Sequence, residues 1–239
     1  MTGGLSQHQR DALARYFWLL KSHPELFSGR ARRPIVREAE MLEAFAEEHS
    51  VVLGVSVETP YLWLINDLVQ SRDSSGVVLF HPYLRLIAPP RADAAPGVVV
   101  LATVQTDSAQ TIVLVEQERH ATGTLELELP RGFGEPSTSP DSQALQELRD
   151  ETGYVGNQAE CLGTTLTDSG TTDRSVSFFH VPVTGRAAMT PEPQEAISRI
   201  VLLTIEELWT RIDTGSVRDA FTVQALALYE RRLATSASS

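Results

Sequence analysis

The sequence predicts an α/β fold preceded by an N-terminal helical extension. Segments with the apolar patterns of β-strands alternate with segments of helical periodicity through most of the chain, and this order is typical of α/β proteins. Residues 1–50 carry only helical patterns. With 239 residues, 42% of them hydrophobic, the chain can form one large domain or a domain with a substantial extension.

Two helices are expected in the extension, over residues 6–22 and 34–49, because apolar residues recur there at helical spacing. The turn between them, residues 28–34, is basic and suggests a helix-turn-helix. A DNA-binding role conflicts with the formal charge of −11, the sequence pI near 5.0 and the lack of a clear third helix. A packing or dimerisation element is therefore the preferred interpretation.

A β-hairpin region is expected next. Residues 51–57, 61–69 and 77–87 are rich in β-forming residues, and the turn-forming run Arg72-Asp-Ser-Ser-Gly76 separates the last two. A proline-rich linker, residues 88–97, follows. The predicted domains are a helical extension, a strand region that is a candidate dimerisation element, a main α/β domain and a polar tail, over residues 1–50, 51–90, 91–234 and 235–239.

The main domain contains further strand and helix patterns on both sides of a glycine loop. The expected strands cover residues 98–104, 111–117, 125–129, 161–167, 176–183 and 197–203, and two expected helices lie around residues 206–209 and 219–233.

A helix is predicted directly after the glycine loop. Ser139 can cap its N-terminus, Pro140 suits the first helical position and Gly153 is a natural C-terminal stop.

Three carboxylates share one face of this helix. Glu147, Asp150 and Glu151 are spaced i, i+3 and i+4, and Arg149 is expected to point away without neutralising them. Oxygen ligands in this arrangement suit Mg²⁺ or Mn²⁺, the ions that bind diphosphates. The alternative is a solvated acidic face.

The segment from Leu129 to Gly153 resembles the Nudix box, G-x5-E-x7-R-E-U-x-E-E-x-G-U, where U is aliphatic. The positions in register with it are Gly132, Glu147, Leu148, Asp150, Glu151 and Gly153. Thr138 and Gln146 stand where the family has Glu and Arg, a pair that orients the metal-binding helix. We interpret the two neutral residues as a replacement scaffold contact; a decayed catalytic site is the competing interpretation.

The flanking sequences are similar to ADP-ribose and nucleotide-sugar diphosphatases. The similar segments are residues 115–119, 126–132, 168–173 and 216–222. The resemblance implies a Nudix-type α/β/α sandwich with a mixed sheet, and Mg²⁺- or Mn²⁺-dependent hydrolysis of ADP-ribose or a related nucleoside diphosphate sugar. The products are a nucleoside monophosphate and a sugar phosphate. It also implies a homodimer built with the N-terminal strands.

The resemblance assigns metal ligands residue by residue. Glu147 and Glu151 are the leading ligands, and Asp150 is a third ligand or activates the attacking water. The backbone carbonyl of Arg131, just before the box glycine, is a further ligand, and its side chain is a candidate for substrate binding.

Substrate contacts and a general base follow from the same resemblance. Arg119 matches the family's phosphate-side arginine; alternatively it is a surface arginine that pairs with Glu116 or Glu118. Glu128 is a candidate supporting residue beside the substrate. Glu192 and Glu195 lie in an acidic loop after the box, and Glu195 is the preferred base because it precedes the expected strand at residue 197.

Composition limits the remaining possibilities. A single cysteine, Cys161, excludes an intrachain disulfide, and no signal peptide or membrane-spanning run is apparent. We therefore expect a cytoplasmic protein with a small-molecule substrate and neither a nucleic acid nor a membrane as partner. Two alternatives stay open: a regulatory Nudix-like module that binds a nucleotide without cleaving it, and a hydrolase for a specialised phosphorylated metabolite.

Overall fold

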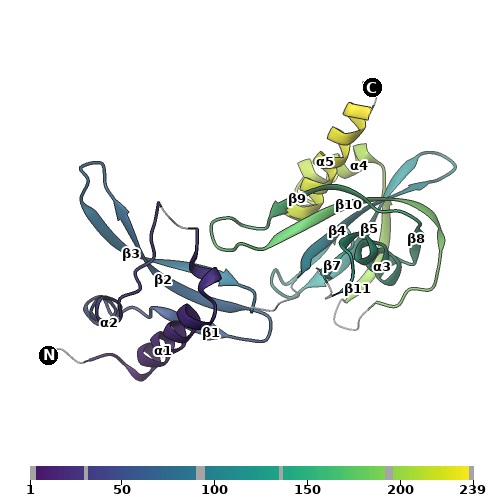
Figure 1. Cartoon of the computed structure of the whole chain (residues 1–239). Helices are drawn as coiled ribbons and strands as arrows, with labels where there is room; N and C mark the ends of the chain where they lie inside the picture. The colour runs from purple at the N-terminus through teal and green to yellow at the C-terminus, as the bar shows by residue number, and fades with distance from the viewer. Residues whose placement is uncertain (1–3, 30–31, 90–94, 135–136, 192–195, 237–239) are drawn as a thin grey trace. The chain divides into compact units, whose positions relative to one another are not determined.

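A computed structural model describes residues 4–29, 32–89, 95–134, 137–191 and 196–236. The chain forms two compact units. The N-terminal unit consists of Met1–Ala92 and Thr167–Arg174, and the C-terminal unit of Asp93–Leu166 and Ser175–Ser239. Each unit has a sheet of its own (Figure 1).

The N-terminal unit packs helices on a small sheet. Its elements are α1 (Gln7–Ser22), the 3₁₀ turn η1 (Pro24–Phe27), α2 (Ala39–Glu48), β1 (Gly54–Glu58), β2 (Trp63–Arg72) and β3 (Val78–Ile87). The three strands are antiparallel in the order β1-β2-β3. Tyr16 and Leu19 of α1 and Leu42 of α2 share a buried cluster with residues of the sheet, which supports a packing role for these helices.

The predicted helices and strands of this unit are present, and several of their boundaries differ: the strands expected over residues 51–57 and 61–69 are Gly54–Glu58 and Trp63–Arg72. Ser6 caps α1 in a capping box, and β2 and β3 form the predicted hairpin. The second helix begins only at Ala39, because the chain before it is extended: Ile35 bridges to Val69, and the Val36 N–H donates to the Leu68 carbonyl at 2.8 Å.

A buried polar group joins α1 to the sheet of the N-terminal unit. The Tyr16 hydroxyl donates to Asp67 Oδ1 at 2.6 Å, and the Arg85 guanidinium is paired with the same carboxylate. Burial and the neighbouring Asp67 charge raise the pKa of Tyr16. The tyrosine therefore stays protonated and keeps donating its hydrogen bond.

The C-terminal unit contains a mixed eight-stranded sheet. Its central order is β11-β5-β4-β10-β8, with β6, β7 and β9 paired to β5, β4 and β10. The strands are β4 (Ala95–Gln105), β5 (Gln110–Arg119), β6 (Thr124–Glu128), β7 (Arg131–Gly134), β8 (Tyr154–Gly156), β9 (Glu160–Leu166), β10 (Ser175–Arg186) and β11 (Ile197–Leu203). The pair β4 and β10 is parallel and the other pairs are antiparallel, so the mixed sheet is confirmed.

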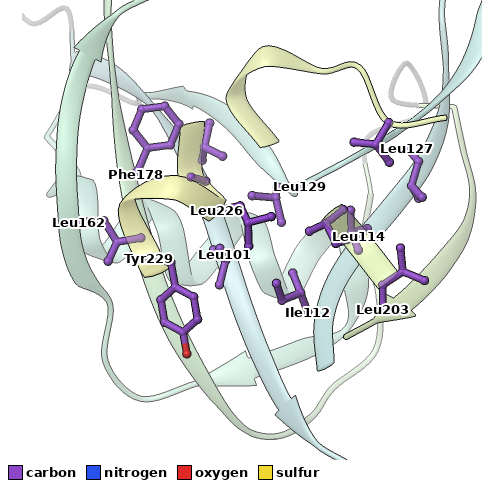
Figure 2. Close-up of a cluster of buried hydrophobic side chains, with 14 of the residues drawn as sticks. Leu101, Ile112, Leu114, Leu127, Leu129, Leu162, Phe178, Leu203, Leu226 and Tyr229 are labelled. Atoms are coloured by element: carbon purple, nitrogen blue, oxygen red, sulfur yellow. The ribbon is translucent and has the colours of Figure 1, made fainter. Parts of the chain in front are cut away.

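Alternating side chains of β4 build the cores on the two sheet faces. Val98 and Val100 pack with Ala144 and Leu148 of α3 (Pro140–Thr152) on one face. Side chains from Val99 and Leu101 point to the other face, towards α4 (Ile205–Asp213) and α5 (Ala220–Ser236). Figure 2 shows this second core, where Leu101 lies among residues of the sheet and of α5. The predicted α/β/α sandwich is confirmed.

Candidate active site

The helix α3 has the predicted ends. Pro140 occupies its first turn after Ser139, although the Ser139 side chain makes no capping bond. Gly153 adopts the left-handed conformation at φ 70°, and its N–H donates to the Arg149 carbonyl at 2.8 Å. The acidic positions are therefore carried by a helix of fixed length beside the short strand β7.

Two of the three predicted carboxylates meet the backbone of β7. Glu151 is 2% exposed and its Oε2 accepts from the Arg131 N–H at 3.3 Å. Glu147 lies against Gly132: a Cβ added to this glycine would stand 1.9 Å from Glu147 Oε1. Glycine is thus required at position 132 because the carboxylate occupies the space of a side chain.

The third carboxylate is engaged elsewhere. Asp150 Oδ1 accepts from Arg149 Nε at 2.9 Å and from the Thr190 hydroxyl at 2.9 Å. The expectation that Arg149 leaves the acidic face unneutralised is wrong, because an exposed arginine can fold back onto its sequence neighbour. Within the described ranges, no three His, Cys, Asp or Glu side chains form a group that could hold a metal.

The residues present nevertheless fit a divalent cation at Glu147 and Glu151. Carboxylate oxygens suit Mg²⁺ and Mn²⁺. A buried amide next to Glu147 adds a second observation: Gln143 Nε2 donates to Glu147 Oε1 at 2.6 Å, while its Oε1 has no hydrogen-bond partner among the described residues. An orphaned buried oxygen beside a carboxylate suits a cation or its bound water.

Two arginines share one buried carboxylate next to this helix. Arg119 donates to Glu128 with both Nε and Nη2, each at 2.8 Å, and Arg131 Nη2 lies 2.5 Å from Glu128 Oε2. Glu128 is 1% exposed, and its hydrogen bond raises the pKa of Arg119. The Arg119 side chain is 34% exposed and that of Arg131 is 23% exposed, so both keep solvent-facing surface.

Arg119 thus pairs with Glu128 on the neighbouring strand β6. Glu116, one of its two expected alternative partners, accepts two hydrogen bonds from Arg199, at 2.7 and 2.8 Å. The two candidate general bases, Glu192 and Glu195, lie outside the described residues.

A further site residue, Asp219, did not emerge from the sequence as a candidate. Its Oδ1 lies 3.2 Å from Arg131 Nη1, and the Arg131 guanidinium also lies 5.0 Å from the centre of the Phe221 ring. Asp219 lies in the segment 216–222, which resembles the diphosphatases, but that resemblance assigned no role to this aspartate.

A protein-family model identifies the family of this chain. The NUDIX domain model matches residues 94–224, more than half of the chain. The chain belongs to the Nudix family. The match begins one residue before β4 and ends within α5, so it includes the carboxylates of α3 and both arginines.

This Nudix chain is similar to proteins that are named as pyrophosphatases. An ADP-sugar pyrophosphatase of Mus musculus is 32% identical over 141 residues, which are 56% of this chain and 65% of that protein. The ADP-ribose pyrophosphatase of Bacillus subtilis (strain 168) is 28% identical over 135 residues, which are 55% of this chain and 70% of that protein. The match therefore spans slightly less than two thirds of the mouse relative.

A solved structure shares the fold. The structure described as an ADP compounds hydrolase has a TM-score of 0.59 at 17% identity, and the match covers 76% of this Nudix chain and 91% of the other. None of the helices in the described part of the chain is both long and apolar enough to cross a membrane.

Proposed function

We propose that this Nudix protein hydrolyses the diphosphate bond of ADP-ribose or a related nucleoside diphosphate sugar, with Mg²⁺ or Mn²⁺ as cofactor. The products are a nucleoside monophosphate and a sugar phosphate. The observation that carries the proposal is the meeting of Glu147 and Glu151 with the backbone at Arg131 and Gly132. The names of the mouse and B. subtilis relatives support the substrate class.

Each residue has a chemical task in this proposal. Glu147 and Glu151, with the Arg131 carbonyl, would hold the metal ion, which when bound would polarise the phosphate oxygens and activate the attacking water. Arg119 and Arg131 are the cationic groups that bind the diphosphate, because guanidinium groups form charge-assisted hydrogen bonds with phosphate oxygens. Glu128 keeps the two guanidinium groups side by side, although like charges repel.

The proton acceptor for the attacking water comes from an acidic side chain. Glu195 is our proposed base, with Glu192 as its alternative, and Asp150 is a third metal ligand or assists the water. The Arg149 and Thr190 contacts of Asp150 would have to rearrange for direct ligation. We further propose that the protein is a cytoplasmic homodimer. Light scattering coupled to size-exclusion chromatography tests the oligomeric state.

The first experiment is a substrate panel. The pure protein is incubated with ADP-ribose, nucleotide sugars, dinucleotides and nucleoside triphosphates, with Mg²⁺, with Mn²⁺ or with EDTA, and the phosphate monoesters are measured. Glu151→Gln is the test variant, and Glu206→Gln on the exposed surface of α4 is the matched control. We expect metal-dependent cleavage that Glu151→Gln lowers at least about 100-fold and Glu206→Gln leaves unchanged.

The second candidate function is nucleotide binding without turnover. It is favoured by the neutral residues Thr138 and Gln146 at the two box positions where the family has a charged pair. Tight binding of ADP-ribose with no cleavage under any metal condition would replace the hydrolase proposal by this one. Cleavage of only other phosphorylated compounds would move the proposal to a different substrate.

A further inference from the structure

Gln143 is a buried amide in the polar part of α3. It lies one helical turn before Glu147, is 2% exposed, and donates from Nε2 to Glu147 Oε1 at 2.6 Å. The other end of the amide, Oε1, has no hydrogen-bond partner among the described residues. An unsatisfied buried acceptor lowers stability, so stability alone does not account for a glutamine here.

Two neighbours define the position of the Glu147 carboxylate. It packs against Gly132, which has no side chain to displace it, and it accepts a short hydrogen bond from Gln143. We infer that Gln143 is the positioning residue that orients Glu147 for metal binding in this chain. This inference rests on the proposed function of Glu147 as a metal ligand.

The two residues that replace the family's charged pair do not provide this support. Gln146 is exposed, and no hydrogen bond between it and Thr138 is present in the described part of the helix and loop. The predicted replacement contact is therefore not formed by Thr138 and Gln146. Gln143 is a neutral donor, so its hydrogen bond to Glu147 brings no positive charge to the carboxylate.

Metal affinity measured without substrate tests the inference. Calorimetric titration of Mn²⁺ is carried out on the wild type, Gln143→Met, Gln146→Met and Glu147→Gln. We expect Gln143→Met to bind Mn²⁺ at least about tenfold more weakly, the usual effect of losing the partner of a metal ligand. Gln146→Met is the matched control, because it makes the same substitution three residues later in the helix, at an exposed position. Its Mn²⁺ affinity should equal that of the wild type.

Thermal stability separates positioning from a structural role. Methionine has a similar volume and removes the unsatisfied oxygen, so metal-free Gln143→Met should melt at or above the wild-type temperature. A lower melting temperature with unchanged Mn²⁺ affinity would overturn the inference. Should the methionine variant not fold, Gln143→Asn keeps an amide but withdraws it by one methylene, and its affinity must fall in the same way.

Glu147→Gln distinguishes a failure of the proposed metal site from a failure of the role of Gln143. If Glu147→Gln weakens Mn²⁺ binding and Gln143→Met does not, the metal site stands and the role of Gln143 is overturned. If Glu147→Gln binds Mn²⁺ as the wild type does, the proposed metal site fails and the role of Gln143 fails with it.

Discussion

Asp219 holds Arg131 with one carboxylate oxygen and fixes the first turn of α5 through Thr222 with the other. Oδ1 lies 3.2 Å from Arg131 Nη1, and Oδ2 accepts from both the N–H and the hydroxyl of Thr222 at 2.8 Å. The Thr222 hydroxyl also accepts from the Leu129 N–H at 3.1 Å. The start of α5 is thereby joined to the segment that leads into β7.

Two substitutions separate the functions of Asp219. Asp219→Asn removes the charge facing Arg131 but keeps an oxygen for the Thr222 N–H, so it should raise the KM for the proposed diphosphate substrate about fivefold, the equivalent of about 1 kcal/mol. Its melting temperature should stay near that of the wild type. Asp219→Ala also loses the cap, worth about 1 kcal/mol, and should melt about 2–4 °C lower. Steady-state kinetics and calorimetry check both; a wild-type KM in Asp219→Asn would contradict this role.

Glu128→Gln should damage stability and substrate binding together. The variant leaves two guanidinium groups beside a neutral amide, and we expect a loss of about 1–3 kcal/mol because both arginines can still reach solvent in part. Urea denaturation measures this loss, and the KM for the proposed diphosphate substrate should rise in the folded variant. The exposed variant Glu206→Gln serves as control. Unchanged stability would mean that Glu128 does not hold the arginine pair.

Local sequence signals predicted the framework of the site. Pro140 and Gly153 act through backbone geometry alone, so the ends of α3 could be placed from the sequence. The continuous apolar runs of β4 and β5 likewise predicted buried strands. The short strand β7 was missed, because its Arg-Gly-Phe-Gly sequence has no β pattern and its pairing to β4 is long-range.

Side-chain partners were predicted less well than the framework. Helical spacing places Asp150 beside Glu147 and Glu151, but the spacing does not determine the rotamer that turns Asp150 towards Arg149 and Thr190. Asp219 is 88 residues from Arg131 in the chain, so only the folded sheet and α5 bring them together.

Gly132→Ala should displace the Glu147 carboxylate. The new Cβ would lie 1.9 Å from Glu147 Oε1, so the side chain must move by more than an ångström, and such a displacement commonly lowers turnover about 100-fold. In Gly185→Ala, the matched control on β10, the Cβ would lie 3.4 Å from Val155 Cγ2, which is close to an ordinary contact. Metal-dependent turnover and Mn²⁺ affinity should fall in Gly132→Ala only. Equal losses in both variants would indicate a general effect of alanine on the sheet.

The pair Glu126 and Arg218 gives the fold a specific dependence on pH. Two hydrogen bonds from Arg218, at 2.6 and 3.1 Å, and one from Thr124 lower the pKa of Glu126 to about 2. The unfolded chain has a glutamate pKa of about 4.3, so the stabilisation is complete above this value and is lost as the pH falls from about 4.3 towards 2. Melting temperatures between pH 2.5 and 7 measure it.

Arg218→Gln should remove this pH-dependent part of the stability. Its melting temperature should lie below that of the wild type at pH 7, and the difference should shrink steadily below about pH 4.3 because protonated Glu126 no longer attracts Arg218. Arg211→Gln, on the exposed surface of α4, is the matched control and should show no such convergence. A difference between wild type and Arg218→Gln that stays constant down to pH 2.5 would show that the charge of Glu126 does not stabilise the fold.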